Sequence, residues 1–256
     1  MRSREELQQL AETYLAELAL TPELGALEAA VRYALAGGGK RIRPVICLAT
    51  GEAAGGDPVL VLPAAAALEL VHNFSLVHDD LPALDNDEVR RGQPSTWAKF
   101  GEANGILAGD ALLSEAFRLA CSYETPAVAR ELAQATLGMI GGQYLDCSGE
   151  ATDLAVLHRL KTGCLFEAAV GLALHAVGLP EREQAPWRAF GAELGLLFQI
   201  VDDILDGDGY VLERGAEGAR ELSDQAADRA HERLRAIPDD TSVLAEIVSG
   251  LAVRTS

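Results

Sequence analysis

Apolar residues recur at three- and four-residue steps along almost the whole chain, and this periodicity restricts the fold more than any other feature. In the first segment, Leu7, Leu10, Tyr14 and Leu18 repeat with the spacing of one helix face. Similar patterns run through residues 23–36, 44–55, 58–80, 103–122, 126–146, 153–177, 187–206, 216–236 and 240–253. No convincing run alternates with the period of a strand. The sequence therefore predicts an all-α fold of about ten helices.

Glycine and proline separate these segments. Gly37-Gly38-Gly39, Gly55-Gly56-Asp57-Pro58 and Leu179-Pro180 are typical turn sequences. No repeat or low-complexity linker divides the 256 residues, so we expect 1–256 to form a single domain. Segments 64–71 and 168–177 are apolar over most of their circumference, which is typical of the central helices of a bundle.

The chain is strongly acidic. It contains 39 Asp and Glu residues against 21 Lys and Arg residues, which gives a formal net charge of −18. Nucleic acids and anionic membrane surfaces require a basic face, so neither is an expected partner. A membrane span needs ~18 uninterrupted apolar residues, whereas Pro63 and Glu69 interrupt the apolar run over 59–71. We therefore expect no membrane span.

Cysteine use and the first residues bear on the compartment. The four cysteines are far apart and form no C-x-x-C pair, which favours a reduced protein. The opening sequence MRSREELQQLAETYL is charged and amphipathic, and it has no apolar core followed by a cleavage site. These features predict a cytoplasmic protein.

Two acidic clusters follow strongly apolar helical segments. The first, HDDLPALDND over 78–87, contains Asp79, Asp80 and Asp85. The second, FQIVDDILD over 198–206, places Asp202 and Asp206 one turn apart on one helix face. Like charges at this spacing repel, and the negative end of the helix dipole adds to the cost. A bound cation would offset this repulsion; solvated acidic helix ends are the alternative.

The ligand types favour magnesium. Carboxylates without Cys or His at ligand spacing select hard divalent ions. Neither cluster has the spacing of an EF-hand loop, whereas Mg²⁺ is commonly held jointly by carboxylates and a substrate's phosphates. The two clusters therefore predict Mg²⁺ together with a phosphorylated substrate.

Basic residues stand where such a substrate needs them. The segment GGGKRIRP combines glycines, whose backbone N–H groups can approach phosphates, with cations just ahead of a predicted helix. Arg90 and Arg91 follow the first acidic cluster, and Lys161 interrupts an apolar helix. GGGKRIRP lacks the spacing of a Walker loop, which disfavours a nucleotide. Each cation alone is typical of a surface salt bridge, but together with both acidic clusters they predict a diphosphate site.

Seven motifs occur in order between about residues 30 and 206: GGGKRIRP, LELVHNFSLVHDDLPALDND, RRGQPS, GDALL, GGQYLD, LKTG and FQIVDDILD. In this combination the chain resembles the trans-isoprenyl diphosphate synthases of the polyprenyl synthetase family, and the bacterial farnesyl diphosphate synthases (geranyltranstransferases) above all. The resemblance implies a single-domain helical bundle around a deep central cavity, and a homodimer. It also implies a prenyltransferase that condenses an allylic diphosphate, dimethylallyl or geranyl, with isopentenyl diphosphate. The allylic diphosphate ionises with the help of Mg²⁺, 1′-4 coupling and proton loss follow, and diphosphate is released.

The resemblance assigns the metal ligands motif by motif. It implies three Mg²⁺ ions, two of them held by Asp79, Asp80 and Asp85. Asp202 would hold the third ion, and Asp203 and Asp206 would support that ion through waters. These six carboxylates are the predicted metal site.

The substrate residues follow in the same way. Arg90 and Lys161 would grip the allylic diphosphate, with Gln143 and Asp146 close to Lys161. The diphosphate of isopentenyl diphosphate would be bound by Gly39, Lys40, Arg43, His72 and Arg91. Thr162 and Gln199 would face the reacting carbons. The implied catalytic set is Asp79, Asp80, Arg90, Lys161, Thr162, Gln199 and Asp202.

Product length is set in this family by the depth of the cavity below the first acidic cluster. Phe74 lies five residues before Asp79, where its ring could floor the cavity, and Ser75 beside it is small. Plain core packing also accounts for Phe74. An aromatic at this place, with the D-D-x-x-x-x-D spacing, resembles the bacterial farnesyl type. The expected product is therefore farnesyl diphosphate (C15), with geranyl and geranylgeranyl diphosphate as alternatives.

Two features depart from the family pattern. A lysine-bearing segment usually follows the second acidic cluster, but here no lysine occurs after Lys161, and Arg214 is a candidate replacement. Trp97 stands where a histidine is common. Both departures concern diphosphate binding or closure of the site, so a non-catalytic partner subunit of a related synthase stays open as an alternative. A terpene cyclase is disfavoured, because its second metal motif differs from D-D-I-L-D.

Overall fold

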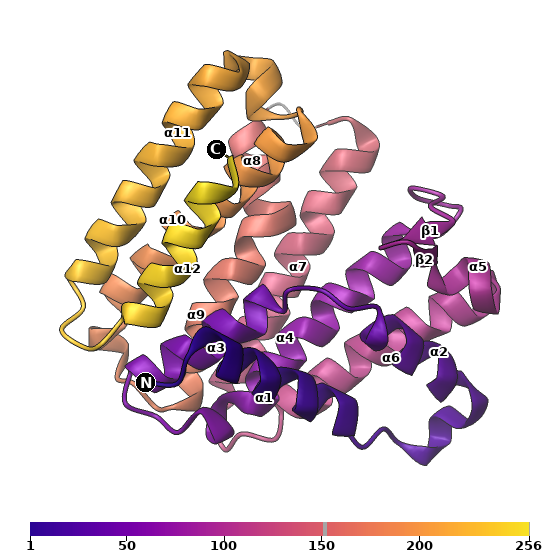
Figure 1. Ribbon diagram of the computed structural model, residues 1–256. Coiled ribbons are helices and arrows are strands. Elements are labelled where there is room, and N and C mark those ends of the chain that lie inside the picture. The colour runs from indigo at the N-terminus through magenta and orange to yellow at the C-terminus, as the bar shows by residue number, and fades with distance from the viewer. Residues whose placement is uncertain (151–152, 256) are drawn as a thin grey trace.

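The computed structural model describes residues 1–150 and 153–255, and helices dominate this part of the chain (Figure 1). The all-α prediction is confirmed. The longer helices are α1 (Arg4–Glu17), α2 (Glu28–Ala36), α3 (Ile42–Ala53), α4 (Pro58–Asp79), α6 (Glu102–Ala120), α7 (Ala127–Ser148), α9 (Cys164–Ala176), α10 (Ala185–Asp206), α11 (Tyr210–Arg235) and α12 (Ser242–Ala252). The shorter helical elements are η1 (Pro22–Leu27), α5 (Thr96–Phe100), α8 (Leu154–His158), η2 (Arg159–Gly163), η3 (Glu181–Glu183) and η4 (Val253–Thr255).

Local sequence signals define where α4 begins and where α10 ends. The Asp57 side chain accepts a hydrogen bond from the backbone nitrogen of Val59 at 3.0 Å, and Pro58 occupies the first turn, where its missing N–H is not needed. Gly207 ends α10 in the left-handed conformation, with φ at 71°. These signals fix the first residue of α4 and the last residue of α10, the two helices whose last turns carry the acidic clusters.

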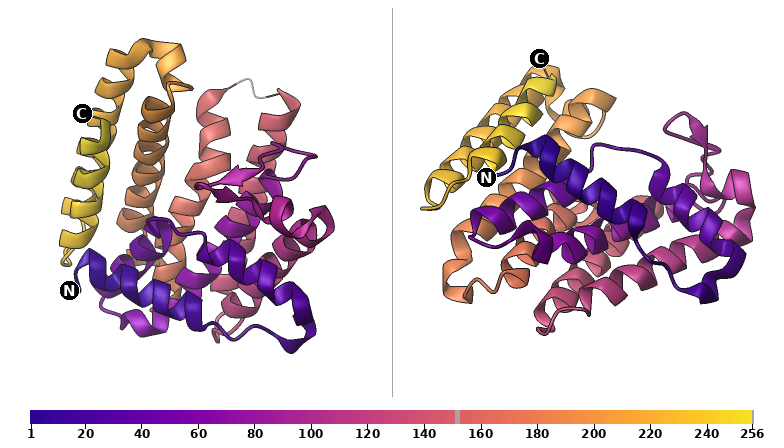
Figure 2. Two further views of the ribbon diagram at one scale, coloured as in Figure 1. Left: turned by 45° about the vertical axis from the view of Figure 1, so that its right-hand side comes forward. Right: turned by 60° about the horizontal axis from the view of Figure 1, so that its bottom comes forward.

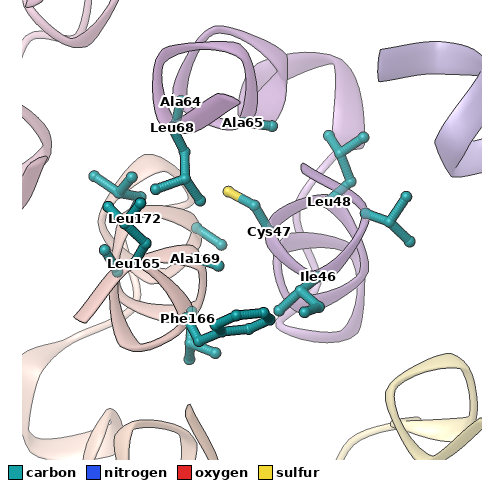
Figure 3. Packing of buried hydrophobic residues seen from close by; sticks show 14 of the residues in the cluster. Ile46, Cys47, Leu48, Ala64, Ala65, Leu68, Leu165, Phe166, Ala169 and Leu172 are labelled. Atoms are coloured by element: carbon teal, nitrogen blue, oxygen red, sulfur yellow. The ribbon is translucent and has the colours of Figure 1, made fainter. Parts of the chain in front are cut away.

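Helices α3, α4 and α9 meet in the centre of the bundle. Ile46 and Cys47 of α3, Leu68 of α4 and Phe166 of α9 are fully buried and converge in Figure 3. Burial of each large side chain of this kind contributes roughly 1.5–3 kcal/mol relative to exposure. The two segments predicted to be central from their composition lie in α4 and α9, so that expectation is confirmed.

The remaining helices surround this centre. Helix α6 packs against α4, α7 against α9, and α10 against both α9 and α11. Figure 2 shows α11 and α12 as an outer pair, with α1 crossing near one end of α12. Buried apolar residues from these helices form one continuous core cluster.

Two elements were not expected from the periodicity. Strands β1 (Val89–Arg90) and β2 (Gln93–Pro94) pair antiparallel, so the expectation of no strand is wrong for this short hairpin. Two-residue strands are too short to show alternation. Within the predicted helix over 153–177, η2 is a π-helical turn rather than regular α-helix, and it carries Lys161.

Helix α4 has the length and apolar composition of a membrane-crossing helix, which the sequence analysis did not anticipate. Of its most apolar window, 67% is buried inside the fold. Glu69, which interrupts the apolar run, is buried in an ion pair with Arg41, with Oε1 and Nη1 2.7 Å apart. Packing at the centre of a bundle therefore accounts for the composition of α4.

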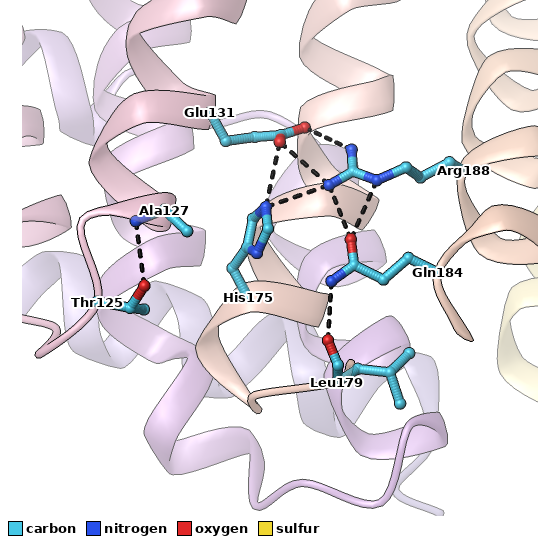
Figure 4. Close-up of polar contacts among 7 residues, drawn as sticks. All are labelled: Thr125, Ala127, Glu131, His175, Leu179, Gln184 and Arg188. Atoms are coloured by element: carbon cyan, nitrogen blue, oxygen red, sulfur yellow. Dashed lines mark hydrogen bonds and ion pairs between the residues drawn. The ribbon is translucent and has the colours of Figure 1, made fainter. Parts of the chain in front are cut away.

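A polar cluster joins α7, α9 and α10 near the start of α7 and α10 (Figure 4). Arg188 donates hydrogen bonds to Glu131 at 2.9 and 3.2 Å and to Gln184 at 2.9 and 3.1 Å. The His175 ring nitrogen lies 3.4 Å from the Glu131 carboxylate. Burial opposes ionisation of Glu131, but hydrogen bonds from His175 and Arg188 outweigh it and lower the Glu131 pKa. The cluster therefore ties three helices together at the end opposite to Asp79 and Asp202.

Candidate active site

The two acidic clusters lie at the same end of the bundle, because α4 and α10 both end there (Figure 1). Asp79 and Asp202 are half-buried. Burial raises the pKa of Asp79 to about 6, and the neighbouring Asp85 adds to the shift. Burial likewise raises the pKa of Asp202 to about 6, with a further contribution from Asp206. Each cluster thus contains a carboxylate whose negative charge is disfavoured in the protein alone.

The second aspartate of each D-D pair is bound to other parts of the protein. Asp80 is buried and accepts a hydrogen bond from Arg90 Nε at 2.9 Å. Asp203 is buried and accepts from the backbone nitrogen of Tyr210 at 2.8 Å and from Gln199 at 2.7 Å. Within each pair, therefore, one carboxylate holds the local structure and the other faces a cavity.

Gln199 and Thr162, which the resemblance places together at the reacting carbons, line different cavities. The Gln199 amide donates to Asp203, and this residue lines a separate cavity of about 300 Å³ together with His158. Thr162 lines a different, apolar cavity beside Asp79. Their shared role at the reacting carbons therefore stays a prediction.

A cationic cavity of about 560 Å³ lies beside Asp202. It is lined by every residue predicted to bind the diphosphate of isopentenyl diphosphate: Gly39, Lys40, Arg43, His72 and Arg91. Gly39 has φ at 126°, and a Cβ atom built on it would lie 2.9 Å from Arg91 Nη1. Arg91 also donates to the carbonyl of Gly38. The glycine run therefore makes room for the guanidinium group.

Arg43 is a buried cation of this cavity. Its guanidinium carbon lies 4.6 Å from the centroid of the Phe166 ring, and its buried Nε has no hydrogen-bond partner among the described residues. Burial lowers the Arg43 pKa. Burial, reinforced by Arg43 and Arg91, holds the pKa of His72 well below its usual range. The cavity therefore presents a buried cation beside a neutral imidazole.

An apolar cavity of about 480 Å³ adjoins Asp79. Its walls come from α4, α7 and η2, and Arg43 and His72 line it as well as the cationic cavity. Of the predicted residues it is lined by Phe74, Ser75, Asp79, Gln143, Lys161 and Thr162. The sequence analysis did not identify its remaining apolar walls: Leu76, Leu84, Met139, Ile140 and Leu165. Leu76 and Leu84 are apolar positions within the motif over 68–87, whereas Met139, Ile140 and Leu165 lie outside all seven motifs.

Phe74 and Lys161 mark two parts of the apolar cavity. Phe74 is 7% exposed and packs edge-on against His78, with ring centroids 4.9 Å apart. Lys161 forms an ion pair with Asp146 of α7, and Gln143 lies one turn before Asp146, so the predicted proximity of these residues is found.

Other predicted residues lie at the edge of the site. Asp85 and Asp206 are exposed. Trp97 donates from Nε1 to the carbonyl of Asp87 at 2.9 Å and so anchors the loop that follows Asp85. Arg214 pairs with its neighbour Glu213 at 3.6 Å on the surface, which does not support it as a replacement for the usual lysines.

The carboxylates fit Mg²⁺ by ligand chemistry. In the part of the chain that the structure describes, no three His, Cys, Asp or Glu side chains are grouped as a complete metal site. Mg²⁺ usually takes one or two carboxylates and completes its shell with water and substrate phosphates. Asp79 and Asp202 meet that requirement, since a cation would relieve the cost of their charge.

Comparison with known proteins agrees with this arrangement. Residues 25–218 match the polyprenyl synthetase family. The chain belongs to this family. The family predicted from the seven motifs is therefore confirmed.

Individual relatives in the polyprenyl synthetase family differ in the product that they are named for. The chain is 44% identical to a geranylgeranyl diphosphate synthase from Cyanophora paradoxa over 69% of its own length and 64% of that protein. It is 43% identical to a farnesyl diphosphate synthase from Geobacillus stearothermophilus over 72% of its own length and 67% of that protein. The chain thus matches just under two thirds of the Cyanophora relative.

A solved structure is similar over nearly the whole chain. The crystal structure of a geranyltransferase from Legionella pneumophila has a TM-score of 0.89 and 32% identity, covering 98% of this chain and 96% of that one. The bundle described above is therefore similar in fold to that of a solved geranyltransferase.

Proposed function

We propose that this polyprenyl synthetase family member is a trans-prenyltransferase that condenses an allylic diphosphate with isopentenyl diphosphate. One observation carries the proposal: the cationic and apolar cavities meet at Arg43 and His72, between Asp79 and Asp202. A diphosphate on one side and a growing hydrocarbon on the other require this pairing of surfaces.

Six carboxylates are the proposed ligands of Mg²⁺, and they divide into two kinds. Asp79 and Asp202 face the cavities and are the proposed direct ligands, with Asp85 and Asp206 exposed beside them. Asp80 and Asp203 hold Arg90 and Tyr210, so we propose that they support the site from behind. Bound Mg²⁺ would neutralise charge that develops on the leaving diphosphate.

The basic residues have complementary roles. Arg90 and Lys161 are held by Asp80 and Asp146, and they are the proposed contacts to the allylic diphosphate. Such positioned cations stabilise a leaving group as its charge develops. Lys40, Arg43 and Arg91 would hold the second diphosphate, so that its double bond meets the allylic carbon.

The apolar walls serve the second half of the reaction. Met139, Ile140 and Leu165 line the cavity beside Thr162. Walls of this kind exclude water, which would otherwise trap the allylic cation as an alcohol. A proton lost from the coupled product would leave on the departing diphosphate. No covalent attachment to the protein is required.

Farnesyl diphosphate is the proposed product. Phe74 is almost buried at the wall of the apolar cavity, and its ring is braced by His78. A ring held in this way limits the length of the hydrocarbon that the cavity accepts. Named relatives include both farnesyl and geranylgeranyl diphosphate synthases, so the position of Phe74 carries this choice.

A homodimer is the proposed assembly. Large exposed apolar side chains outside the cavities occur on α6 and α7: Ile106, Leu107 and Leu137. Exposed apolar side chains of this size are typical of protein interfaces. Light scattering after gel filtration would test the mass, and Leu107→Glu should yield the monomer.

A product assay tests the function. Protein with Mg²⁺ and labelled isopentenyl diphosphate is offered dimethylallyl, geranyl or farnesyl diphosphate, and products are separated by length. We expect a C15 product from the first two primers. A C10 or C20 product would correct only the length. Absence of elongation by folded protein with every primer would contradict the proposal and favour a non-catalytic partner subunit.

A further inference from the structure

Two arginines outside all seven motifs line the cationic cavity. Arg4 lies in the first turn of α1, and Arg254 lies in η4, directly after α12. Both line the same 560 Å³ cavity as Lys40, Arg43 and Arg91. The cavity therefore contains cations from segments that are far apart in the sequence.

The start of α1 lies beside α12, and this brings Arg4 to the cavity. A Cβ atom built on Gly250 would lie 3.8 Å from Arg4 Nη1, an ordinary van der Waals distance, so the guanidinium group lies directly against α12. Figure 2 shows the start of the chain next to α12. Leu251, one residue on, lines the cavity as well. Arg4 is thus held against the helix that leads to Arg254.

Charge makes this gathering of cations notable. The chain carries a net charge of −18, yet Arg4, Lys40 and Arg254 form no salt bridge within the described residues. Burial lowers the Lys40 pKa, and repulsion from Arg254 and Arg4 lowers it further. Cations that repel one another in a concave site, while acidic residues are abundant elsewhere, indicate an anion-binding site.

Acidic groups in the cavity do not cancel these cations. Glu69 is already bound to Arg41 by the buried ion pair. Asp202 is the other carboxylate of the lining, and Arg254 partly offsets the effect of burial on its pKa. Arg254 therefore lies within electrostatic reach of both Lys40 and Asp202.

We propose that Arg4 and Arg254 bind the outer oxygens of the diphosphate of isopentenyl diphosphate and complete its subsite. The inference rests on the proposed function for the identity of the substrate. Lys40, Arg43 and Arg91 hold this diphosphate from the inner side, and the two arginines cover it from α1 and η4.

Separate measurement of KM for isopentenyl diphosphate and KM for the allylic diphosphate tests the proposal. The variants are Arg4→Gln and Arg254→Gln, with Arg182→Gln as the matched control, because the Arg182 side chain is 81% exposed and pairs only with Glu183. KM for isopentenyl diphosphate should rise roughly ten-fold in each site variant, the loss expected for one charged hydrogen bond. KM for the allylic diphosphate should change less than about two-fold, and Arg182→Gln should match wild type. Arg254→Lys should restore part of the affinity.

Calorimetric titration with inorganic diphosphate separates this inference from the proposed function. If wild type turns over and both site variants keep its KM for isopentenyl diphosphate, the inference is wrong and the function stands. If wild type elongates no primer, but its binding of inorganic diphosphate weakens in Arg4→Gln and Arg254→Gln, the anion subsite stands and the function is wrong. Equal binding of inorganic diphosphate by wild type and both variants would overturn the inference.

Discussion

Gly142 and Lys161 pack without space for a side chain between them. A Cβ atom built on Gly142 would lie 2.4 Å from the backbone nitrogen of Lys161 and 2.7 Å from its Cα. The contact lets α7 lie directly against the π-helical turn η2, and it brings Asp146, one turn further along α7, to the Lys161 ammonium. The position of Lys161 in the cavity therefore depends on a glycine in another helix.

Gly142→Ala should force α7 away from η2. Alanine is favoured over glycine in a helix by ~1 kcal/mol, but backbone atoms of Lys161 cannot move aside as a flexible side chain can. Overpacking of this kind costs roughly 1–3 kcal/mol. We expect a net loss of up to about 2 kcal/mol in the free energy of unfolding, measured by denaturant titration, together with a fall in kcat/KM.

The neighbouring glycine supplies the control. A Cβ atom built on Gly141 meets no atom within 4 Å, so Gly141→Ala should keep or slightly raise stability and leave kcat/KM unchanged. A Gly142→Ala protein as stable and as active as Gly141→Ala would show that the helices adjust freely.

The pH dependence of stability should reveal the cost of ionising Asp79 and Asp202. Both pKa values are raised to about 6 in the fold, so between roughly pH 4 and 6 the folded protein binds more protons than the unfolded chain. Stability from these groups is therefore lost as pH rises through this window. Without metal, Asp79→Asn and Asp202→Asn should match wild type in Tm near about pH 4.5 and exceed it near about pH 7.5.

Bound metal should favour the wild type over the Asp79→Asn and Asp202→Asn variants in Tm. With Mg²⁺ and inorganic diphosphate near about pH 7.5, wild type should gain more Tm than either variant, because only the carboxylates bind the ion. Asp239→Asn, on the exposed surface, controls for the loss of one charge. A Tm difference that stays constant across pH would argue against buried ionisation at Asp79 and Asp202.

Much of the fold and the outline of the site could be predicted from the sequence. Spacing of three and four residues located the long helices, because a buried helix face imposes that period. The acidic clusters and GGGKRIRP identified several of the charged residues that line the two cavities, since such charge patterns are costly without a ligand. The β1–β2 hairpin and the π-helical turn at Lys161 have no comparable period, so they were not found.

Side-chain direction could not be predicted. Spacing places Gln199 and Asp203 one helical turn apart, but the backbone nitrogen of Tyr210 and the ring of His158 turn Asp203 away from the cavity. The partners come from elements whose position only the folded chain defines. Arg4 and Arg254 lie outside every motif, so only the folded chain shows that they line the cationic cavity.

Phe74→Ala should lengthen the product. Removing the ring opens the wall of the apolar cavity beside His78, so a C15 chain no longer meets an obstacle. We expect C20 and longer products at the expense of C15, measured by chromatography of dephosphorylated products, with circular dichroism confirming the fold. Ser75→Ala, at the same wall but nearly equal in volume, should leave the product distribution unchanged. An unaltered C15 product from Phe74→Ala would mean that other residues limit chain length.

Glu131→Gln should weaken the fold without affecting catalysis. Glu131 accepts hydrogen bonds from Arg188 and lies 3.4 Å from His175, at the opposite end of the bundle from Asp79. The neutral amide cannot balance the guanidinium charge, and partial exposure reduces the penalty, so we expect a loss of roughly 1–2 kcal/mol in the free energy of unfolding. Glu183→Gln, which removes an exposed pair with Arg182, should cost less than about 0.5 kcal/mol.

The lowered pKa of Glu131 means that its carboxylate stabilises the fold most at pH values above its titration range. The difference in stability between wild type and Glu131→Gln should therefore shrink as pH falls below about 4.5. A lower kcat with unchanged stability would show instead that this distant cluster influences the active site.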